Sequence, residues 1–446
     1  MEDKKLGRRE FLGRSAMLGA AGIVGTSLLS SCGGNGRKPL RKSGEYYLPS
    51  VEDKAISGRK LRVGMVGCGG RGTGALGNLL DAADDIELVA LGDILPGQLR
   101  NCREKIARDY GQTIPDEMCF LGFESYKQVI DSGIDMVILT TPPVFRPEQF
   151  QYAVEKGVHA FLEKPVCIDP VGYRKVIAAS RQARLKGLCV LTGTERRHER
   201  PYVAAYEKIQ QGYIGEIISG EVYWQQGKPW YATREPGMTD MEYMIRDWFN
   251  WRWLAGDHIV EQHVHNIDVF LWMAGDLPRA ATGFGSRVRR RSGDQFDQFS
   301  VDFEFADGKR LHSMCRQIDG CSNRVGEVIH GTRGRWMSKN NSIVDLQGNT
   351  VWQYDETEDK KKYKQHDSYV LEHVDWVNHI RKGDAFVEAE DNANSCMAAI
   401  MGREAAYTGE RTYWEKMIVS DQNFRPEKVG FFDVDLSQFK VPVPGE

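Results

Sequence analysis

The run RVGMVGCGGRGTGALGNLL, residues 62–80, constrains the fold of this chain more than any other stretch. A short apolar segment leads into three glycines spaced G-x-G-x-x-G, at Gly67, Gly69 and Gly72, and a helical pattern follows. The first glycine permits a tight turn, the second lets backbone approach a pyrophosphate, and the third lets helix and strand pack closely. The N-terminus of the helix then faces the phosphates. The pattern predicts the first βαβ unit of a dinucleotide-binding Rossmann domain.

An acidic residue completes this fingerprint. Asp93 ends the next β-rich run, where a carboxylate accepts hydrogen bonds from the adenosine ribose hydroxyls. No arginine follows it to accept a 2′-phosphate, which favours NAD over NADP. The predicted cofactor contacts in this region are Gly67, Cys68, Gly69, Gly70, Arg71, Gly72 and Asp93.

The first half of the chain alternates apolar runs with helical patterns. The strand candidates are 61–66, 86–92, 134–140, 158–162 and 188–192, and the helix candidates between them are 73–83, 97–110, 124–132, 147–156 and 170–186. Near-continuous apolar strands that alternate with helices predict a parallel sheet covered on both faces. We therefore expect an NAD-binding domain at 59–195.

The pattern changes near residue 200. A helix at 201–211 precedes strand-like runs, several of them separated by turn signals, at 217–226, 279–288, 298–306, 309–317, 325–331 and 342–354. Helical patterns at 368–382 and 390–408 follow. The predicted fold class is α/β: a doubly wound parallel Rossmann sheet, then an α/β domain with a large, mostly antiparallel open sheet. The second domain is expected at 196–415, for substrate binding and oligomerisation, with a tail at 416–446.

The N-terminus has the features of an export signal. Arg8-Arg9, with Phe11-Leu12 after them, precedes an apolar run and resembles a twin-arginine signal. Leu29-Ser30-Ser31-Cys32 resembles a lipobox, whose cysteine is lipidated. We expect a signal at 1–32, a linker at 33–58, and a mature protein that is periplasmic or anchored to the membrane by lipidated Cys32. The alternative is a chance arginine pair beside an ordinary secretory signal.

Charge and cysteine spacing exclude several classes of function. The formal net charge of −3 gives no reason to expect a nucleic-acid partner, and we expect membrane contact only through the N-terminal lipid. The cysteines show no C-x-x-C and no zinc-ligand spacing, so no metal site is predicted. Cys315 and Cys321 are the only close pair, and no disulfide is predicted for them.

Two segments carry groups suited to proton transfer. Glu163-Lys164-Pro165 follows the strand at 158–162, at the edge of an open α/β sheet where ligands bind. The segment 256–276 holds three histidines. If it is helical, Glu261 and His265 share a face, whereas in a strand His263 would join them and a metal site becomes conceivable. The alternative to a catalytic role is a structural helix whose polar face forms hydrogen bonds within the protein.

With Thr140-Thr141-Pro142-Pro143, these motifs resemble the Gfo/Idh/MocA oxidoreductases over about residues 60–410. The resemblance implies redox chemistry at a hydroxyl or carbonyl of a sugar or cyclitol, and a dimer or tetramer built through the open sheet. It implies that Lys164 positions substrate and assists proton transfer, that His265 is the acid/base, and that Glu261, where the family has Asp, orients His265. The cofactor contacts that it adds are Thr140, Thr141, Pro142, Glu163 and Lys164. Arg146 stands where the family has His.

Three functions remain open from the sequence. One is an NAD(P)-dependent oxidoreductase that transfers a hydride between a sugar or cyclitol and a tightly bound cofactor. Another resembles glycoside hydrolase family 109, which cleaves glycosides by oxidation, elimination, addition and reduction on retained NAD. The third is a non-catalytic sugar-binding protein. The substrate contacts we expect, with core or interface packing as the alternative, are Arg196, His198, Trp230, Tyr231, Arg246, Trp248 and His263.

Overall fold

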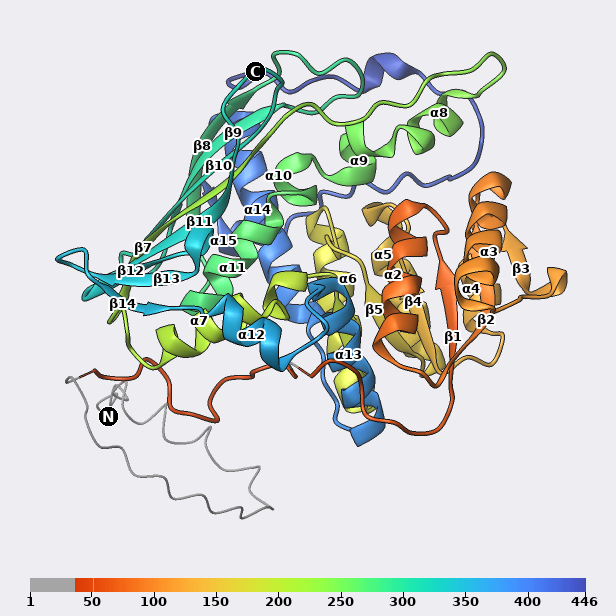
Figure 1. The fold of residues 1–446 in the computed structure, drawn as a ribbon. Coiled ribbons are helices and arrows are strands. Elements are labelled where there is room, and N and C mark those ends of the chain that lie inside the picture. The colour runs from red at the N-terminus through yellow and green to blue at the C-terminus, as the bar shows by residue number, and fades with distance from the viewer. Residues whose placement is uncertain (1–36, 51) are drawn as a thin grey trace, which may run out of the picture. The chain divides into compact units, whose positions relative to one another are not determined.

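The computed structural model describes residues 37–50 and 52–446. Residues 38–446 form one compact unit that contains two sheets (Figure 1). The signal predicted at 1–32 lies outside the described residues.

The first sheet is a Rossmann sheet. Its parallel strands run in the order β3-β2-β1-β4-β5-β6. Their bounds are β1 (Leu61–Val66), β2 (Ile86–Asp93), β3 (Cys119–Leu121), β4 (Met136–Leu139), β5 (His159–Leu162) and β6 (Val190–Thr192). The order reverses direction between β1 and β4, and ligands of such sheets bind in the crevice at the carboxyl ends of the strands.

Helices cover both faces of this sheet (Figure 1). They are α2 (Gly70–Ala82), α3 (Pro96–Tyr110), α4 (Ser125–Ile130), α5 (Arg146–Lys156) and α6 (Pro170–Leu185). A sixth, α13 (Ser368–Lys382), arrives from far along the chain and packs on α2. Trp376 of α13 is fully buried in the core of this domain.

The second sheet runs in the order β14-β13-β12-β11-β7-β10-β9-β8-β15. Its strands are β7 (Ile217–Gln226), β8 (Ala280–Ser286), β9 (Gln298–Glu304), β10 (Arg310–Gln317), β11 (Arg324–Gly331), β12 (Gly334–Met337), β13 (Ser342–Asp345), β14 (Thr350–Gln353) and β15 (Thr412–Tyr413). β7 and β10 pair in parallel, and the other neighbouring pairs of the described chain are antiparallel. The predicted fold class is confirmed.

One face of the second sheet carries helices. α11 and α14 lie between this sheet and the Rossmann domain (Figure 1). The helices of this half are α7 (Arg200–Gln210), α8 (Asp240–Arg246), α9 (Arg252–Ala255), α10 (His258–Glu261), α11 (Val264–Ala274), α12 (Glu356–Lys362), α14 (Ala389–Thr408) and α15 (Trp414–Met417).

The structure corrects several sequence predictions. Strands β3, β12 and β15 were missed, because each has only two to four residues and, unlike the equally short β4, β5 and β6, none lies in a longer apolar run. The run at 342–354 is a hairpin of β13 and β14 rather than one strand. The segment at 256–276 is two helices, α10 and α11, with a break at Gln262 and His263.

The expected linker is packed against the fold over its described part. Leu40 donates its backbone N–H to Gln210 O at 2.9 Å, and Ser50 donates to Oδ1 of Asp375 at 2.9 Å. Tyr47 donates its hydroxyl to Asp375 at 2.5 Å. We call residues 38–50 and 52–56 the N-terminal strap. The expectation of a free tether is wrong for it, because polar composition alone does not reveal buried partners supplied by distant helices.

Candidate active site

The glycine turn at the start of α2 has the shape that a dinucleotide requires. Gly67 has φ +96°, and a Cβ on Gly72 would stand 1.9 Å from the carbonyl oxygen of Gly67, so both positions demand glycine. By contrast, a Cβ on Gly69 or Gly70 would meet no atom within 4 Å. Open space therefore faces the N-terminus of α2, where a pyrophosphate binds. The fingerprint loop fits the cofactor.

Asp93 fixes this loop as well as facing the cofactor region. Its Oδ2 accepts the N–H of Cys68 at 2.6 Å, and its Oδ1 accepts the N–H of Leu95 at 2.8 Å. Burial raises the pKa of Asp93, and these backbone donors oppose that shift. Each carboxylate oxygen keeps a second acceptor position for a ribose hydroxyl.

The residues after β4 close the other side of the turn. Thr140 donates its hydroxyl to Gly67 O at 2.7 Å, and Thr141 donates to Oε1 of Gln149 at 2.7 Å. Pro142 caps the short helical turn that follows. Arg146 is buried beneath the Glu163–Pro165 turn, where it donates to Pro165 O at 2.7 Å and burial lowers its pKa to about 10.

Lys164 binds Glu261 of α10. Its Nζ donates to the backbone oxygen of Glu261 at 2.5 Å and to its Oε1 at 3.0 Å. Both side chains are largely buried. An ammonium group has three N–H donors, so one remains for a substrate oxygen.

His265 pairs with a residue that the sequence analysis missed. Its Nδ1 lies 3.1 Å from Oε2 of Glu195, which belongs to the short turn before α7. Burial alone would raise the pKa of Glu195, but His265, Arg196 and Lys164 lower it to about 2. The ring of Trp224 stacks on His265 with centroids 5.6 Å apart. With Nδ1 held, Nε2 is the nitrogen left for substrate.

This arrangement corrects the expected role of Glu261. The carboxylate of Glu261 binds Lys164, and the carboxylate near His265 is that of Glu195. The expectation failed because it required one continuous helix, and the chain breaks between α10 and α11. The only sequence signal for Glu195 was its place in GTERRH, directly after β6 at the same sheet edge.

Three of the expected substrate contacts, Arg196, His198 and His263, have buried partners within the protein. Arg196 forms an ion pair with fully buried Glu327. His263 lies in the core, with its Nε2 2.8 Å from the hydroxyl of Ser313, and burial lowers its pKa to about 3. His198 is buried between Glu388 and Asp375, 3.5 and 3.6 Å away. The described partners of these three side chains are groups of the protein, and their contact with substrate stays a prediction.

The expected aromatic contacts form a cluster of their own. Trp230 lies edge-on to Trp248 at 6.3 Å and remains 48% exposed. Tyr231 follows it in the same partly exposed loop, and Arg246 is engaged by Glu242 at 2.9 Å. Trp230 therefore keeps exposed aromatic surface on which a sugar could stack.

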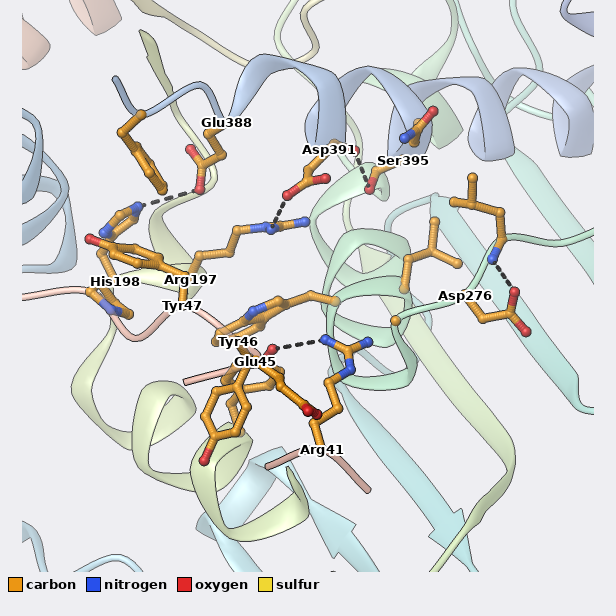
Figure 2. A pocket seen from close by; sticks show the side chains of 18 residues that line it. Arg41, Glu45, Tyr46, Tyr47, Arg197, His198, Asp276, Glu388, Asp391 and Ser395 are labelled. Carbon is orange, nitrogen blue, oxygen red and sulfur yellow. Dashed lines mark hydrogen bonds and ion pairs between the residues drawn. The ribbon is translucent and has the colours of Figure 1, made fainter. Parts of the chain in front are cut away.

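A separate cavity of about 420 Å³ lies beneath the N-terminal strap (Figure 2). Arg41, Tyr46 and Tyr47 of the strap line it, together with Arg197 and His198. Figure 2 shows Arg197 directed at Asp391 and His198 at Glu388, so these polar groups are engaged within the wall. Neither Lys164 nor His265 lines this cavity.

Within residues 37–50 and 52–446, no group of three or more His, Cys, Asp or Glu side chains is arranged to hold a metal ion. The cysteines of this part are free thiols. None of its helices is both long and apolar enough to cross a membrane.

Two family models match this chain. The model described as "Oxidoreductase family, NAD-binding Rossmann fold" covers residues 61–191, and the Gfo/Idh/MocA C-terminal domain covers 202–337. Together they span more than half of the chain. The protein belongs to the Gfo/Idh/MocA family. It is a nicotinamide-dependent oxidoreductase, with the cofactor cradle and the Lys164 and His265 pairs at one sheet edge.

Individual relatives agree with this assignment. The chain is 24% identical to scyllo-inositol 2-dehydrogenase (NAD(+)) of Bacillus subtilis, over 62% of this chain and 72% of that protein. It is 29% identical to a glycosyl hydrolase family 109 protein of Shewanella pealeana, over 49% of this chain and less than half of that protein's length (45%). The solved aldose–aldose oxidoreductase of Caulobacter crescentus shares the fold, with a TM-score of 0.61 and 18% identity over 80% of this chain and 100% of that one.

Proposed function

We propose that this protein oxidises a hydroxyl carbon of a sugar or cyclitol, or reduces the carbonyl, on an NAD molecule that stays bound. The observation that carries the proposal is the pair of acid/base groups, Lys164 and His265, each held by its own carboxylate beside the cofactor cradle. The nicotinamide, when bound, accepts or returns the hydride. Asp93 supports NAD over NADP, because a carboxylate at that position repels a 2′-phosphate.

Side chains of the protein transfer the proton. Nε2 of His265 takes the proton of the reacting hydroxyl, since Nδ1 faces Glu195. The resulting imidazolium is stabilised by the Glu195 carboxylate. The remaining N–H of Lys164 donates to the same substrate oxygen and polarises it, while Glu261 keeps the ammonium in place.

The test is to purify the protein without added cofactor, release bound nucleotide by denaturation, and measure NAD(H) per chain. The protein as purified is then mixed with sugars and cyclitols while bound-NADH absorbance is recorded. About one NAD per chain and reduction by a sugar or cyclitol support the proposal. An empty protein that no polyol reduces, even with NAD added, contradicts it.

A glycosidase is the second candidate, and the two separate ion pairs favour it. Oxidation of a ring hydroxyl two carbons away from the anomeric carbon acidifies the C–H of the carbon between them, so elimination needs a base for that proton and an acid for the leaving oxygen. Two independently held groups can divide these steps between them. The similarity to the family 109 protein points the same way. Cleavage of aryl glycosides in D₂O with deuterium at the carbon next to the oxidised one would establish this function, whereas oxidation without cleavage would exclude it.

We also propose that the protein is exported and held at a membrane by lipidated Cys32. Leu40 is already docked on the fold, so at most about 28 Å of extended chain separates it from Cys32. Export of the folded protein would carry NAD along with it, which suits a cofactor that is recycled in place. Palmitate labelling with a Cys32→Ala control tests the anchor, and unlabelled wild-type protein would refute it.

Assembly through the open sheet is proposed from the family resemblance. Phe284 of β8 is 73% exposed and offers apolar surface to a second copy. Light scattering should show a dimer or tetramer that Phe284→Lys weakens, and a monomeric wild type would contradict the proposal.

A further inference from the structure

Arg71 links the two ends of the cofactor site. It follows Gly69 and Gly70, whose open side faces the expected pyrophosphate. Its Nε forms an ion pair with Glu163, the residue directly before Lys164. The guanidinium therefore lies between the phosphate cradle and the group that works beside the nicotinamide.

Helix α13 holds Arg71 in this position. The guanidinium carbon lies 4.5 Å from the centroid of the Tyr369 ring, and Nη2 lies 3.3 Å from Oε1 of Glu372. Glu372 is fully buried, whereas Tyr369 is 38% exposed. Arg71, whose side chain is 35% exposed, is therefore held by a buried carboxylate and by a partly exposed aromatic ring.

The helix that carries these two residues is itself fixed. Asp367 caps its first turn by accepting the N–H of Tyr369 at 2.9 Å. Trp376, two turns later, is buried in the Rossmann core and donates Nε1–H to Cys189 O at 3.2 Å. Helix α13, about 300 residues further along the chain, thus supplies a rigid support for Arg71 of the fingerprint loop.

We propose that Tyr369 and Glu372 lock Arg71 across the nicotinamide half of the cofactor and thereby slow its release. This inference rests on the proposed function, since it explains how NAD is retained through a closed redox cycle. Tyr369 and Glu372 act as positioning residues through Arg71. Release of the cofactor then requires the Tyr369–Arg71 stack to break.

The test follows cofactor release directly. Purified protein is loaded with NADH, mixed rapidly with a large excess of NAD⁺, and the loss of NADH fluorescence gives the dissociation rate. Loss of a cation–π contact of this kind predicts about two- to thirty-fold faster release in Tyr369→Ala. Tyr369→Phe keeps the ring and should release NADH within about twofold of the wild-type rate.

Tyr363 provides a matched control. Its ring lies 4.0 Å from the guanidinium carbon of Arg200, a pair of the same kind in the neighbouring segment of chain. Tyr363→Ala should leave the release rate unchanged, and melting temperatures of all variants report folding separately.

The outcomes separate the two proposals. Faster release in Tyr369→Ala alone supports the lock. Wild-type release from Tyr369→Ala, or equal acceleration in Tyr363→Ala, overturns the lock and leaves the proposed function intact. A wild-type protein that binds no NADH overturns both, and that result is seen before any variant is made.

Discussion

Replacing Glu195 with Gln tests the catalytic pairing most directly. Oε2 of Glu195 lies 3.1 Å from Nδ1 of His265, and only 12% of the Glu195 side chain is exposed. The substitution keeps the shape and removes the negative charge. It therefore isolates the part of catalysis that depends on stabilising a protonated His265.

The magnitude follows from the pKa of Glu195. Its value falls from 4.5 to about 2 although burial opposes the shift, which corresponds to about 3 kcal/mol of net attraction to nearby cations. His265 contributes most of the lowering, ahead of Arg196 and Lys164. The protonated form of His265 is therefore less stable in the variant, because the neighbouring negative charge is gone. The acid limb of the pH profile of oxidation should move toward lower pH.

The rate should also fall, because the imidazole loses the group that fixes its orientation and stabilises its charge. We expect kcat of Glu195→Gln to drop about 10²-fold, within the range typical of acid–base contributions. The assay is the pH dependence of kcat for oxidation, with bound NAD confirmed in each preparation.

Glu199→Gln is the matched control. Glu199 lies close in the chain, and burial, opposed by Arg196, raises its pKa to about 7. In this variant, the acid limb of the pH profile of kcat should stay at its wild-type pH. The reasoning is refuted if Glu195→Gln retains wild-type kcat and profile, or if Glu261→Gln shifts the limb instead.

The remaining predictions concern the cofactor loop, the core and the ammonium group. Gly69→Ala should fold normally yet lose NADH affinity at least about tenfold, whereas Gly72→Ala should fail to fold properly, since its Cβ would stand 1.9 Å from Gly67 O. Thermal melts measure the folding of the two variants, and NADH fluorescence measures their cofactor binding. Equal behaviour of the two variants would contradict the proposed cofactor cradle. Buried neutral His263 has a pKa lowered from 6.5 to about 3, so its contribution to stability is complete above pH 6.5 and is lost as the pH falls toward 3. Wild type should lose about 3 kcal/mol by pH 4 that His263→Asn does not lose, as measured by urea unfolding; identical acid sensitivity would disprove this. Lys164→Ala should lose about 10²–10³-fold in kcat, with bound NADH measured in the same preparation, and an unchanged kcat would contradict the role of Lys164 in proton transfer.

Much of the site could be predicted from short stretches of sequence, because the backbone geometry that it requires is set within a few residues. The spacing of Gly67, Gly69 and Gly72 is a backbone requirement within one turn, and the strand before it and helix after it have clear periodicity. Lys164 was found because a strand end in an open α/β sheet places its next residues at the ligand edge.

The errors have two physical origins. The carboxylate near His265 is Glu195 rather than Glu261, because the chain breaks at Gln262 between α10 and α11, whereas the expectation required one continuous helix. His198 and His263 looked like site residues, since a sequence does not distinguish a buried histidine from an exposed one. Burial is a property of the assembled fold.

The sequence by itself therefore determined the two-sheet architecture and the cofactor loop and pointed to Lys164 and His265 as candidates for acid/base chemistry, because glycine conformation, strand and helix periods and strand-end positions act over short stretches of chain. Only the tertiary structure decided which carboxylate serves which base. It also decided that Tyr369 and Glu372 reach Arg71, and that the N-terminal strap packs on α13. These contacts join residues tens to hundreds of positions apart, and their geometry is set by how the helices pack, which no local pattern encodes.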